Sequence, residues 1–243
     1  MVGTRKKPAL SIAIPAHNEE KYIGRCIESI LSSAQRAGKT VEVVVALNRC
    51  VDQTRTIAES LGARCIVNDT KCIAAVRNAA VRDTAAAAVS TIDADDWMAP
   101  ETISAVLKLI YDPNYIGGGA MVRFERVSLG ILFSLLASAP YLARHRVSAG
   151  MFWFLRETFE AIGGFNESLV SAEDLDFALR LKAYGKTRGK RYGTIWRHGI
   201  ITSCRKFDRF GDWYFFRNPR VVKEIFKGTN RKVTDKVYYD VDR

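Results

Sequence analysis

The feature of this chain that most constrains its fold is an alternation of short apolar runs with helical stripes through its first half. Four strands are expected, at Leu10–Pro15, Val41–Leu47, Arg64–Val67 and Val89–Ile92. Between them, apolar residues recur every three or four positions, which is typical of amphipathic helices. Such alternation predicts βαβ units and a mostly parallel central sheet flanked by helices, the α/β class.

The second half is less regular. Its expected elements are a strand at Met151–Leu155, a short helix at Glu157–Ile162, and a helix at Ala172–Tyr184 that Gly185 ends. A further strand is expected to end near His198. No repeat or linker divides the 243 residues, so we expect a single domain.

Polar residues follow three of the expected strands, at His17–Glu19, Asn48–Asp52 and Asp93–Asp96. In parallel sheets, ligands bind beyond the carboxyl ends of the strands. The sequence therefore predicts a functional site at this edge of the sheet.

Three carboxylates stand within four residues at Asp93-Ala94-Asp95-Asp96. Their mutual repulsion is relieved if a cation lies among them, and carboxylate oxygens suit Mg²⁺ or Mn²⁺. A polar cap on a loop is the alternative interpretation. Pleat geometry directs Asp93 and Asp95 to one face and turns Asp96 away.

A second acidic group, Glu173, Asp174 and Asp176, begins the expected helix at Ala172–Tyr184. Carboxylates at a helix N-terminus are favoured by the helix dipole, so a purely structural role fits. Asp174 fits equally well as a general base.

Charge and cysteine content narrow the partners and the compartment. The chain has 37 basic and 26 acidic residues, a formal net charge of +11 and a pI near 9.5, which favours phosphorylated, nucleic-acid or anionic membrane partners, or simply a solvated surface. The five cysteines form no C-x-x-C pair, and neither a zinc site nor a disulfide framework is indicated. Without a signal-peptide pattern, we expect a cytoplasmic protein.

An uncharged, mostly apolar stretch, Val127–Ala143, has basic residues on both sides. It is too short to span a bilayer and contains Pro140. Either a helix lying at a membrane interface or a buried core helix fits this pattern.

Four segments together resemble the family-2 glycosyltransferases, which have a nucleotide-sugar-binding α/β fold of the GT-A type. The segments are Ile14-Pro15-Ala16-His17-Asn18-Glu19-Glu20, Asn48-Arg49-Cys50-Val51-Asp52-Gln53-Thr54, Asp93-Ala94-Asp95, and the block from Gly150 through Gly163-Gly164-Phe165 to Glu173-Asp174. They match, in order, the family's P-x-x-N-E, N-D-G-S-x-D-x-T, D-x-D and acceptor-side motifs. The resemblance runs from about Leu10 to Gly185.

The resemblance implies a role for each matching position. Residues 8–120 would form a Rossmann-like nucleotide-sugar-binding half, residues 121–204 the acceptor and base half, and residues 205–243 a basic aromatic tail. The donor-binding residues would be Pro15, His17, Glu19, Asp52, Arg77 and Asp93. Asp95 would bind Mn²⁺ or Mg²⁺, Asp174 would be the base, and Glu173 would orient it or the acceptor. His198 is a further candidate metal ligand, with a bystander histidine as the alternative.

The implied activity is an inverting, metal-dependent transfer of a sugar from a nucleoside-diphosphate sugar to an acceptor hydroxyl. The family's processive members carry a Q-x-x-R-W motif, which is missing here, so a single transfer is expected. The expected acceptor is lipid-linked or a cell-surface polysaccharide, with peripheral contact at the inner membrane face. Two alternatives remain, a nucleic-acid-binding protein and an inactive nucleotide-binding protein on the same fold, although no nucleic-acid partner is expected.

The second segment departs from the family pattern, because Arg49-Cys50-Val51 stands where glycine and serine are usual. This leaves the donor's identity open. The aromatic and basic residues from Arg205 to Arg220 fit an acceptor-site lid, a membrane anchor or ordinary core.

Overall fold

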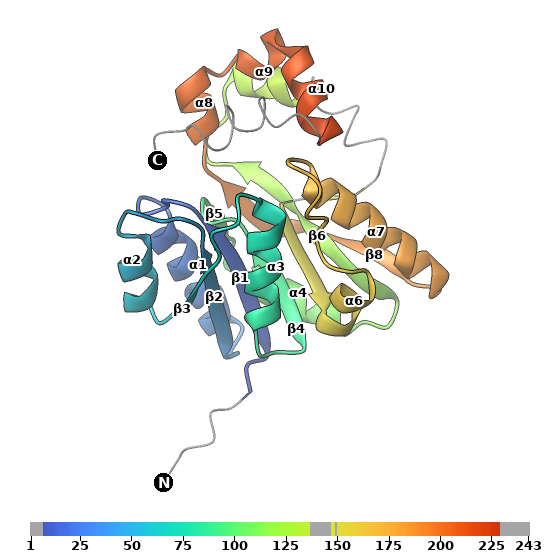
Figure 1. The fold of residues 1–243 in the computed structure, drawn as a ribbon. Coiled ribbons are helices and arrows are strands. Elements are labelled where there is room, and N and C mark those ends of the chain that lie inside the picture. The colour runs from blue at the N-terminus through green and yellow to red at the C-terminus, as the bar shows by residue number, and fades with distance from the viewer. Residues whose placement is uncertain (1–6, 137–146, 149, 229–243) are drawn as a thin grey trace.

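The centre of the protein is an eight-stranded sheet in the order β3-β2-β1-β4-β7-β6-β8-β5 (Figure 1). The computed structural model describes residues 7–136, 147–148 and 150–228. The strands are β1 Leu10–Ala16, β2 Val41–Leu47, β3 Arg64–Val67, β4 Ala88–Ile92, β5 Asp96–Met98, β6 Tyr115–Phe124, β7 Met151–Leu155 and β8 Arg191–Thr202. The first four pair in parallel, as do β6 and β8, whereas β7 and β5 pair antiparallel to their neighbours.

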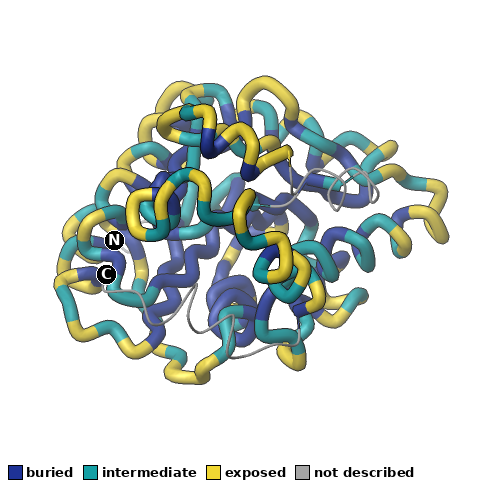
Figure 2. The backbone as a smooth tube through the Cα atoms, turned by 90° about the horizontal axis from the view of Figure 1, so that it is seen from above, coloured by how far each residue is buried: buried dark blue, intermediate teal, exposed yellow. Residues whose placement is uncertain are grey.

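Helices cover both faces of this sheet (Figure 1). They are α1 Ile23–Arg36, α2 Thr54–Ser60, α3 Ile73–Asp83, α4 Thr102–Ile110, α6 Arg156–Ala161 and α7 Glu173–Thr187. Helices α1, α2 and α4 bury one face in an aliphatic cluster. Helices α3, α6 and α7 bury the other, where five phenylalanines pack together. The buried tube segments of Figure 2 therefore run through the middle of the molecule.

The mostly parallel α/β fold predicted from the sequence is confirmed, and strands β1 to β4 and β7 lie within a residue of their predicted positions. Two boundaries were wrong. Helix α7 continues through Gly185 to Thr187, because Gly185 has helical geometry and lies against Ile116. Strand β8 does not end near His198 but runs on to Thr202.

Strand β6 was not predicted, because its run of glycines gives no β-branched signal. The glycines are required by close packing. A Cβ at Gly118 would lie 2.0 Å from the carbonyl oxygen of Gly193 and 2.5 Å from the Trp153 ring. Only a residue without a side chain fits between these strands.

A small helical layer lies above the carboxyl ends of the strands (Figure 1). It contains α8 Arg205–Phe210, α9 Tyr214–Arg217, α10 Pro219–Lys227 and a helix over residues 129–136. Ile131, Cys204 and Phe207 form its own small core. The part of the predicted stretch Val127–Ala143 beyond residue 136 lies outside the described residues, as do residues 229–243 of the tail. Within the described ranges, no helix combines the length and apolar character needed to cross a membrane.

Candidate active site

A pocket of about 200 Å³ opens at the carboxyl ends of β1 and β4, between the start of α7 and the start of α8. Its lining includes eight residues predicted as site residues: Pro15, His17, Glu19, Arg77, Asp93, Asp95, Glu173 and Asp174. Segments more than 150 positions apart in the sequence therefore meet in one place. Two predicted residues, Asp52 and His198, are not among the lining residues.

The first loop of the site is held against the second by hydrogen bonds. His17 Nδ1 lies 2.6 Å from the carbonyl oxygen of Asn48, and because that oxygen only accepts, Nδ1 carries the proton. The Asn48 amide donates in turn to the carbonyl groups of Asn68 and Thr70. These contacts fix the pocket wall that follows β1 and β2.

Asp52 lies beside the pocket, where it joins the same two loops. Its carboxylate accepts hydrogen bonds from the Thr54 hydroxyl at 2.6 Å, the Thr54 amide at 3.0 Å and the Glu20 amide at 3.0 Å. Burial alone would raise the pKa of Asp52, but these donors outweigh it and hold the pKa below its usual value. In this structure its oxygens stabilise the loops.

Arg77 connects the two acidic motifs. From α3, its Nη1 donates to Glu173 Oε1 at 3.0 Å and its Nη2 to Asp93 Oδ1 at 2.6 Å. The side chains of Arg77 and Glu173 are only 6% and 9% exposed, whereas Asp93 is 41% exposed. Asp93 therefore remains open to a ligand while Arg77 and Glu173 form a buried support behind it.

The environment of this buried pair shifts the pKa values of both Glu173 and Arg77. Burial, and secondly the carboxylate of Asp174, raise the pKa of Glu173 to about 7, and Arg77 offsets this only in part. For Arg77, burial alone would lower the pKa, but Asp93 and Glu173 raise it, so the guanidinium stays charged. A carboxyl group that titrates near neutrality in a pocket is typical of a functional site.

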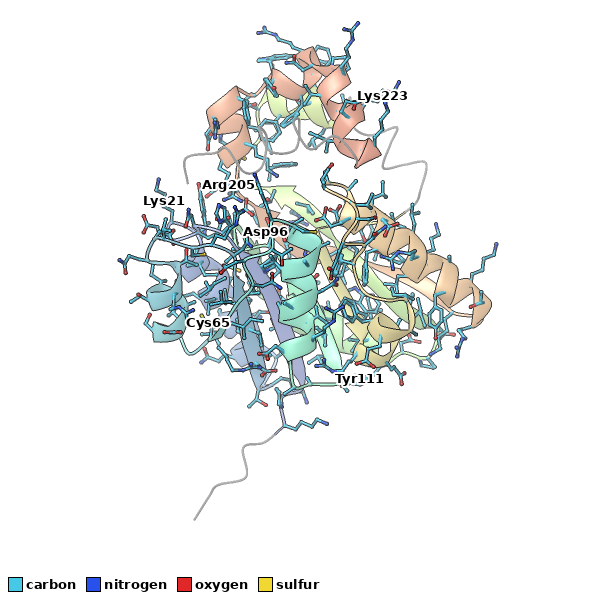
Figure 3. The ribbon with its side chains drawn as sticks, viewed as in Figure 1. Lys21, Cys65, Asp96, Tyr111, Arg205 and Lys223 are labelled. Atoms are coloured by element: carbon cyan, nitrogen blue, oxygen red, sulfur yellow. The ribbon has the colours of Figure 1, made fainter. Side chains whose placement is uncertain are left out.

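Arg205 was not predicted as a site residue, yet it lines the pocket. Its Nε is 2.8 Å from Asp95 Oδ2, and its Nη1 donates to Glu19 Oε2 at 2.6 Å. The Ser203 hydroxyl also donates to Asp95 Oδ2, at 2.9 Å. Figure 3 shows Arg205 reaching from the helical layer toward the strand ends. Sequence reasoning assigned this arginine to the basic tail, because nothing local marks it as different from its neighbours.

The third carboxylate of the acidic cluster, Asp96, is not part of the pocket. It is buried at the start of β5, opposite Thr202. Burial, followed by the charges of Asp95 and Asp93, raises its pKa well above the usual value. Only Asp93 and Asp95 of the cluster face the pocket.

Asp174 lies at the first turn of α7, where its Oδ1 accepts the backbone N–H of Leu175 at 3.0 Å. Ala172, the residue just before α7, has a left-handed backbone with φ 56° and lines the pocket. This conformation costs an alanine roughly 1 kcal/mol. Strained residues of this kind cluster at functional sites, where surrounding contacts hold them in place.

The carboxylates of Asp93 and Asp95 fit a divalent cation that takes its other ligands from phosphate and water. Mg²⁺ commonly binds to proteins through one or two carboxylates in this way. In the described part of the chain, no group of three or more histidine, cysteine or acidic residues could hold a metal by itself. His198 lies on β8 with its Nδ1 3.4 Å from Glu101 Oε2, and the structure does not bring it to this pocket.

Comparison with known proteins identifies the class of enzyme. Residues 11–165 match the model of glycosyl transferase family 2. The match covers more than half of the chain, so this protein belongs to that family and is a glycosyltransferase.

Curated relatives include the chondroitin synthase of Escherichia coli, which is 28% identical over 84% of this chain, and the hyaluronan synthase of Pasteurella multocida, which is 27% identical over 82%. This chain spans 31% and 21% of their lengths. The glycosyltransferase AglE of Haloferax volcanii is 24% identical, over 86% of this chain and 70% of its own length.

Solved structures share the GT-A transferase fold. S. aureus TarS 1–349 in complex with UDP-GlcNAc superposes with a TM-score of 0.61 at 19% identity, covering 94% of this chain and 70% of that one. The mannosyltransferase PcManGT of Pyrobaculum calidifontis, in complex with GDP-Man and Mn²⁺, gives 0.62 at 19% identity, covering 89% and 62%.

Proposed function

We propose that this glycosyltransferase moves a sugar from a nucleoside-diphosphate sugar to an acceptor hydroxyl, in a single displacement that inverts the anomeric centre. The observation that carries the proposal is the Glu173–Arg77–Asp93 bridge. This bridge connects Asp93, which follows β4 and is suited to bind the donor, to Glu173 at the start of α7, next to Asp174. Solved structures with the same fold bind UDP-GlcNAc and GDP-Man, which supports a donor of this class.

On the donor side, the loops after β1 and β4 receive the nucleotide. Pro15, His17 and Glu19 line the pocket wall next to Asp93, and Asp52 stabilises the loop that would face the nucleobase. Asp95, with Asp93, would hold Mn²⁺ or Mg²⁺, and the bound ion would neutralise the charge that develops on the departing diphosphate. Arg205 and Lys206 add positive charge from the tail side of the same pocket.

On the acceptor side, Asp174 takes the proton of the attacking hydroxyl. It lines the pocket from the start of α7, across from the strand ends that carry Asp93 and Asp95. An inverting displacement requires a base on the side of the sugar opposite the leaving group. Glu173 holds Arg77, and through it Asp93, and acts as a positioning residue.

The domain organisation follows from these roles. Residues 8–120 form the nucleotide-sugar-binding half of one domain, and residues 121–204 supply the acceptor and base half. The tail from residue 205 contributes Arg205 and Lys206 to the same pocket. A single domain therefore contains the whole reaction centre.

Slow hydrolysis of the donor tests the base, because water can replace an unidentified acceptor. Asp174→Asn should lower the hydrolysis rate of the active nucleotide sugar by ~100-fold or more, while the Kd for the nucleoside diphosphate stays unchanged. Asp176→Asn is the matched control, since Asp176 lies in the same helical turn and pairs with Arg180 at 2.7 Å. Equal rates for Asp174→Asn and the control would contradict the assignment.

We also propose peripheral contact with an anionic membrane through the helical layer. Eight of the fourteen large apolar side chains that are exposed in the described residues lie at 127–136 and 213–216. Leu129, Leu132, Phe133 and Leu136 follow a helical period and form one face. Exposed basic residues of the same layer, Arg209, Arg217, Arg220 and Lys223, complement anionic headgroups.

Sedimentation with vesicles tests this contact. The protein should sediment with phosphatidylglycerol vesicles and remain in solution with phosphatidylcholine vesicles. The pair Leu132→Gln and Leu136→Gln should release it, whereas Leu31→Gln on α1 should have no effect. Sedimentation that is insensitive to the double substitution would reject this face as the contact.

A further inference from the structure

A second pocket, of about 280 Å³, adjoins the candidate active site inside the helical layer. Its walls are mainly apolar, and their apolar residues are Phe124 of β6, Leu135 of the 129–136 helix, Phe207 of α8, Phe215 of α9, and Val222, Ile225 and Phe226 of α10. An apolar cavity of this size next to polar groups is typical of a small-molecule site.

The polar groups in its wall are satisfied by the protein itself. The Ser134 hydroxyl donates to the carbonyl oxygen of Asp212 at 2.9 Å and accepts the Phe216 N–H at 3.2 Å. The Ser203 hydroxyl is bonded to Asp95 at 2.9 Å. The wall therefore offers a ligand mainly apolar contact, which favours a hydrocarbon group over a sugar.

Asp95 and Lys206 line both pockets, so the two pockets adjoin at these residues. A molecule whose polar end reaches the donor pocket at this point has its other end in the apolar pocket. On the outer side, Leu135 is 37% exposed and neighbours the exposed Leu132 and Leu136. The apolar pocket therefore lies between the donor pocket and the apolar face of the layer.

We propose that the apolar pocket receives the hydrocarbon chain of an amphiphilic acceptor, whose hydroxyl-bearing end lies near Asp174. This inference rests on the proposed transferase function and names the acceptor class, a molecule with a sugar or phosphate head on an alkyl or prenyl chain. Burial of the chain supplies affinity, and the polar end is thereby directed to the junction at Asp95 and Lys206.

The test uses a fluorescent chain, 11-(dansylamino)undecanoic acid, below the concentration at which it forms micelles. The whole protein should bind it in a one-to-one ratio with enhanced emission, and dodecyl phosphate should displace it. Leu135→Gln should raise the Kd for the dansyl chain roughly three- to tenfold, because one apolar wall contact is lost. Leu31→Gln is the matched control, since Leu31 is 39% exposed against 37% for Leu135 and lies on α1, away from both pockets.

Two further measurements separate the possible failures. If Leu132→Gln weakens the dansyl chain as much as Leu135→Gln does, the chain binds the outer face and the pocket assignment is overturned. Nucleotide binding, followed by thermal shift with Mn²⁺, should be equal in the native protein, Leu135→Gln and Leu31→Gln, which also shows that the variants fold. Nucleotide binding without dansyl binding overturns this inference alone, whereas dansyl binding without binding of any nucleotide overturns the donor site and the acceptor role with it.

Discussion

Replacing Arg77 with methionine should destabilise this protein far more than removing a surface arginine. Arg77 and Glu173 are 6% and 9% exposed and 3.0 Å apart, so the substitution leaves a buried carboxylate without its cation. Removing one partner of a buried ion pair typically costs about 3–5 kcal/mol. The contact with Asp93 adds little to this cost, because Asp93 is 41% exposed and can be solvated. We therefore expect a loss of about 3 kcal/mol in the free energy of unfolding at pH 8.

The cost should depend on pH, because Glu173 can escape it by taking up a proton. Urea unfolding of Arg77→Met should show a smaller loss at pH 6 than at pH 8. Adding Glu173→Gln to Arg77→Met should restore at least about 1.5 kcal/mol at pH 8, since the unpaired charge is then gone. Arg55→Met is the control, because Arg55 forms an exposed helical pair with Glu59 and should cost less than about 0.5 kcal/mol. A loss for Arg77→Met no larger than that of the control would refute the reasoning.

Three further outcomes follow, two from the charges of the site and one from the packing of β6 against β8. Burial and Asp174 raise the pKa of Glu173 to about 7 from 4.5, so the folded state binds a proton that the unfolded state has lost, and Glu173's contribution to stability falls by on the order of 2–3 kcal/mol as the pH rises through this window. Glu173→Gln should remove this pH dependence from urea unfolding between pH 5 and pH 8. Parallel plots of unfolding free energy against pH for the native protein and the variant would contradict the shift. Arg205→Ala should give a thermal shift with Mn²⁺ alone that the native protein lacks, because Asp95 and Glu19 lose the guanidinium that lies 2.8 and 2.6 Å from them. An unchanged response to Mn²⁺ would argue against competition between Arg205 and the metal. Gly118→Ala should cost more than about 2 kcal/mol and leave little folded protein on gel filtration, because its Cβ would overlap the Gly193 carbonyl oxygen; a normal melting curve would show that the strands can separate.

The first half of the fold was predictable because its signals are local. Each of β1 to β4 is a short run with many apolar residues, whose boundaries can be read from the residues themselves, although β3 is only partly buried. The polar residues after β1 and β4 do line the pocket. The second half depends on contacts between distant segments. The glycines of β6 are explained by distant residues that pack against them, such as Trp153 at Gly117 and Gly118, and Ser148 at Gly119. No local pattern contains that information.

The same distinction applies to the site. The acidic motifs are compact in the sequence and were identified, but the roles of Asp52 and His198 depend on where their side chains lie. The Asp52 carboxylate accepts hydrogen bonds from Thr54 and Glu20. His198 lies on β8, which runs farther than predicted, and its ring faces Glu101. Arg205 was missed because its partners, Glu19 and Asp95, precede it by 186 and by more than 100 positions. A sequence motif cannot register such a contact.

The most direct test of the central claim is a thermal-shift panel of UDP, GDP, dTDP and CDP, each with and without Mn²⁺. A ligand at ~100 times its Kd adds about 2.7 kcal/mol of stability, which is a shift of roughly 5–10 °C for a domain of this size. The account predicts a Mn²⁺-dependent shift with at least one nucleotide, which is lost in Asp95→Asn and kept in Asp176→Asn. A shift that survives Asp95→Asn in full, or no shift with any of the four nucleotides, would contradict the proposed donor site.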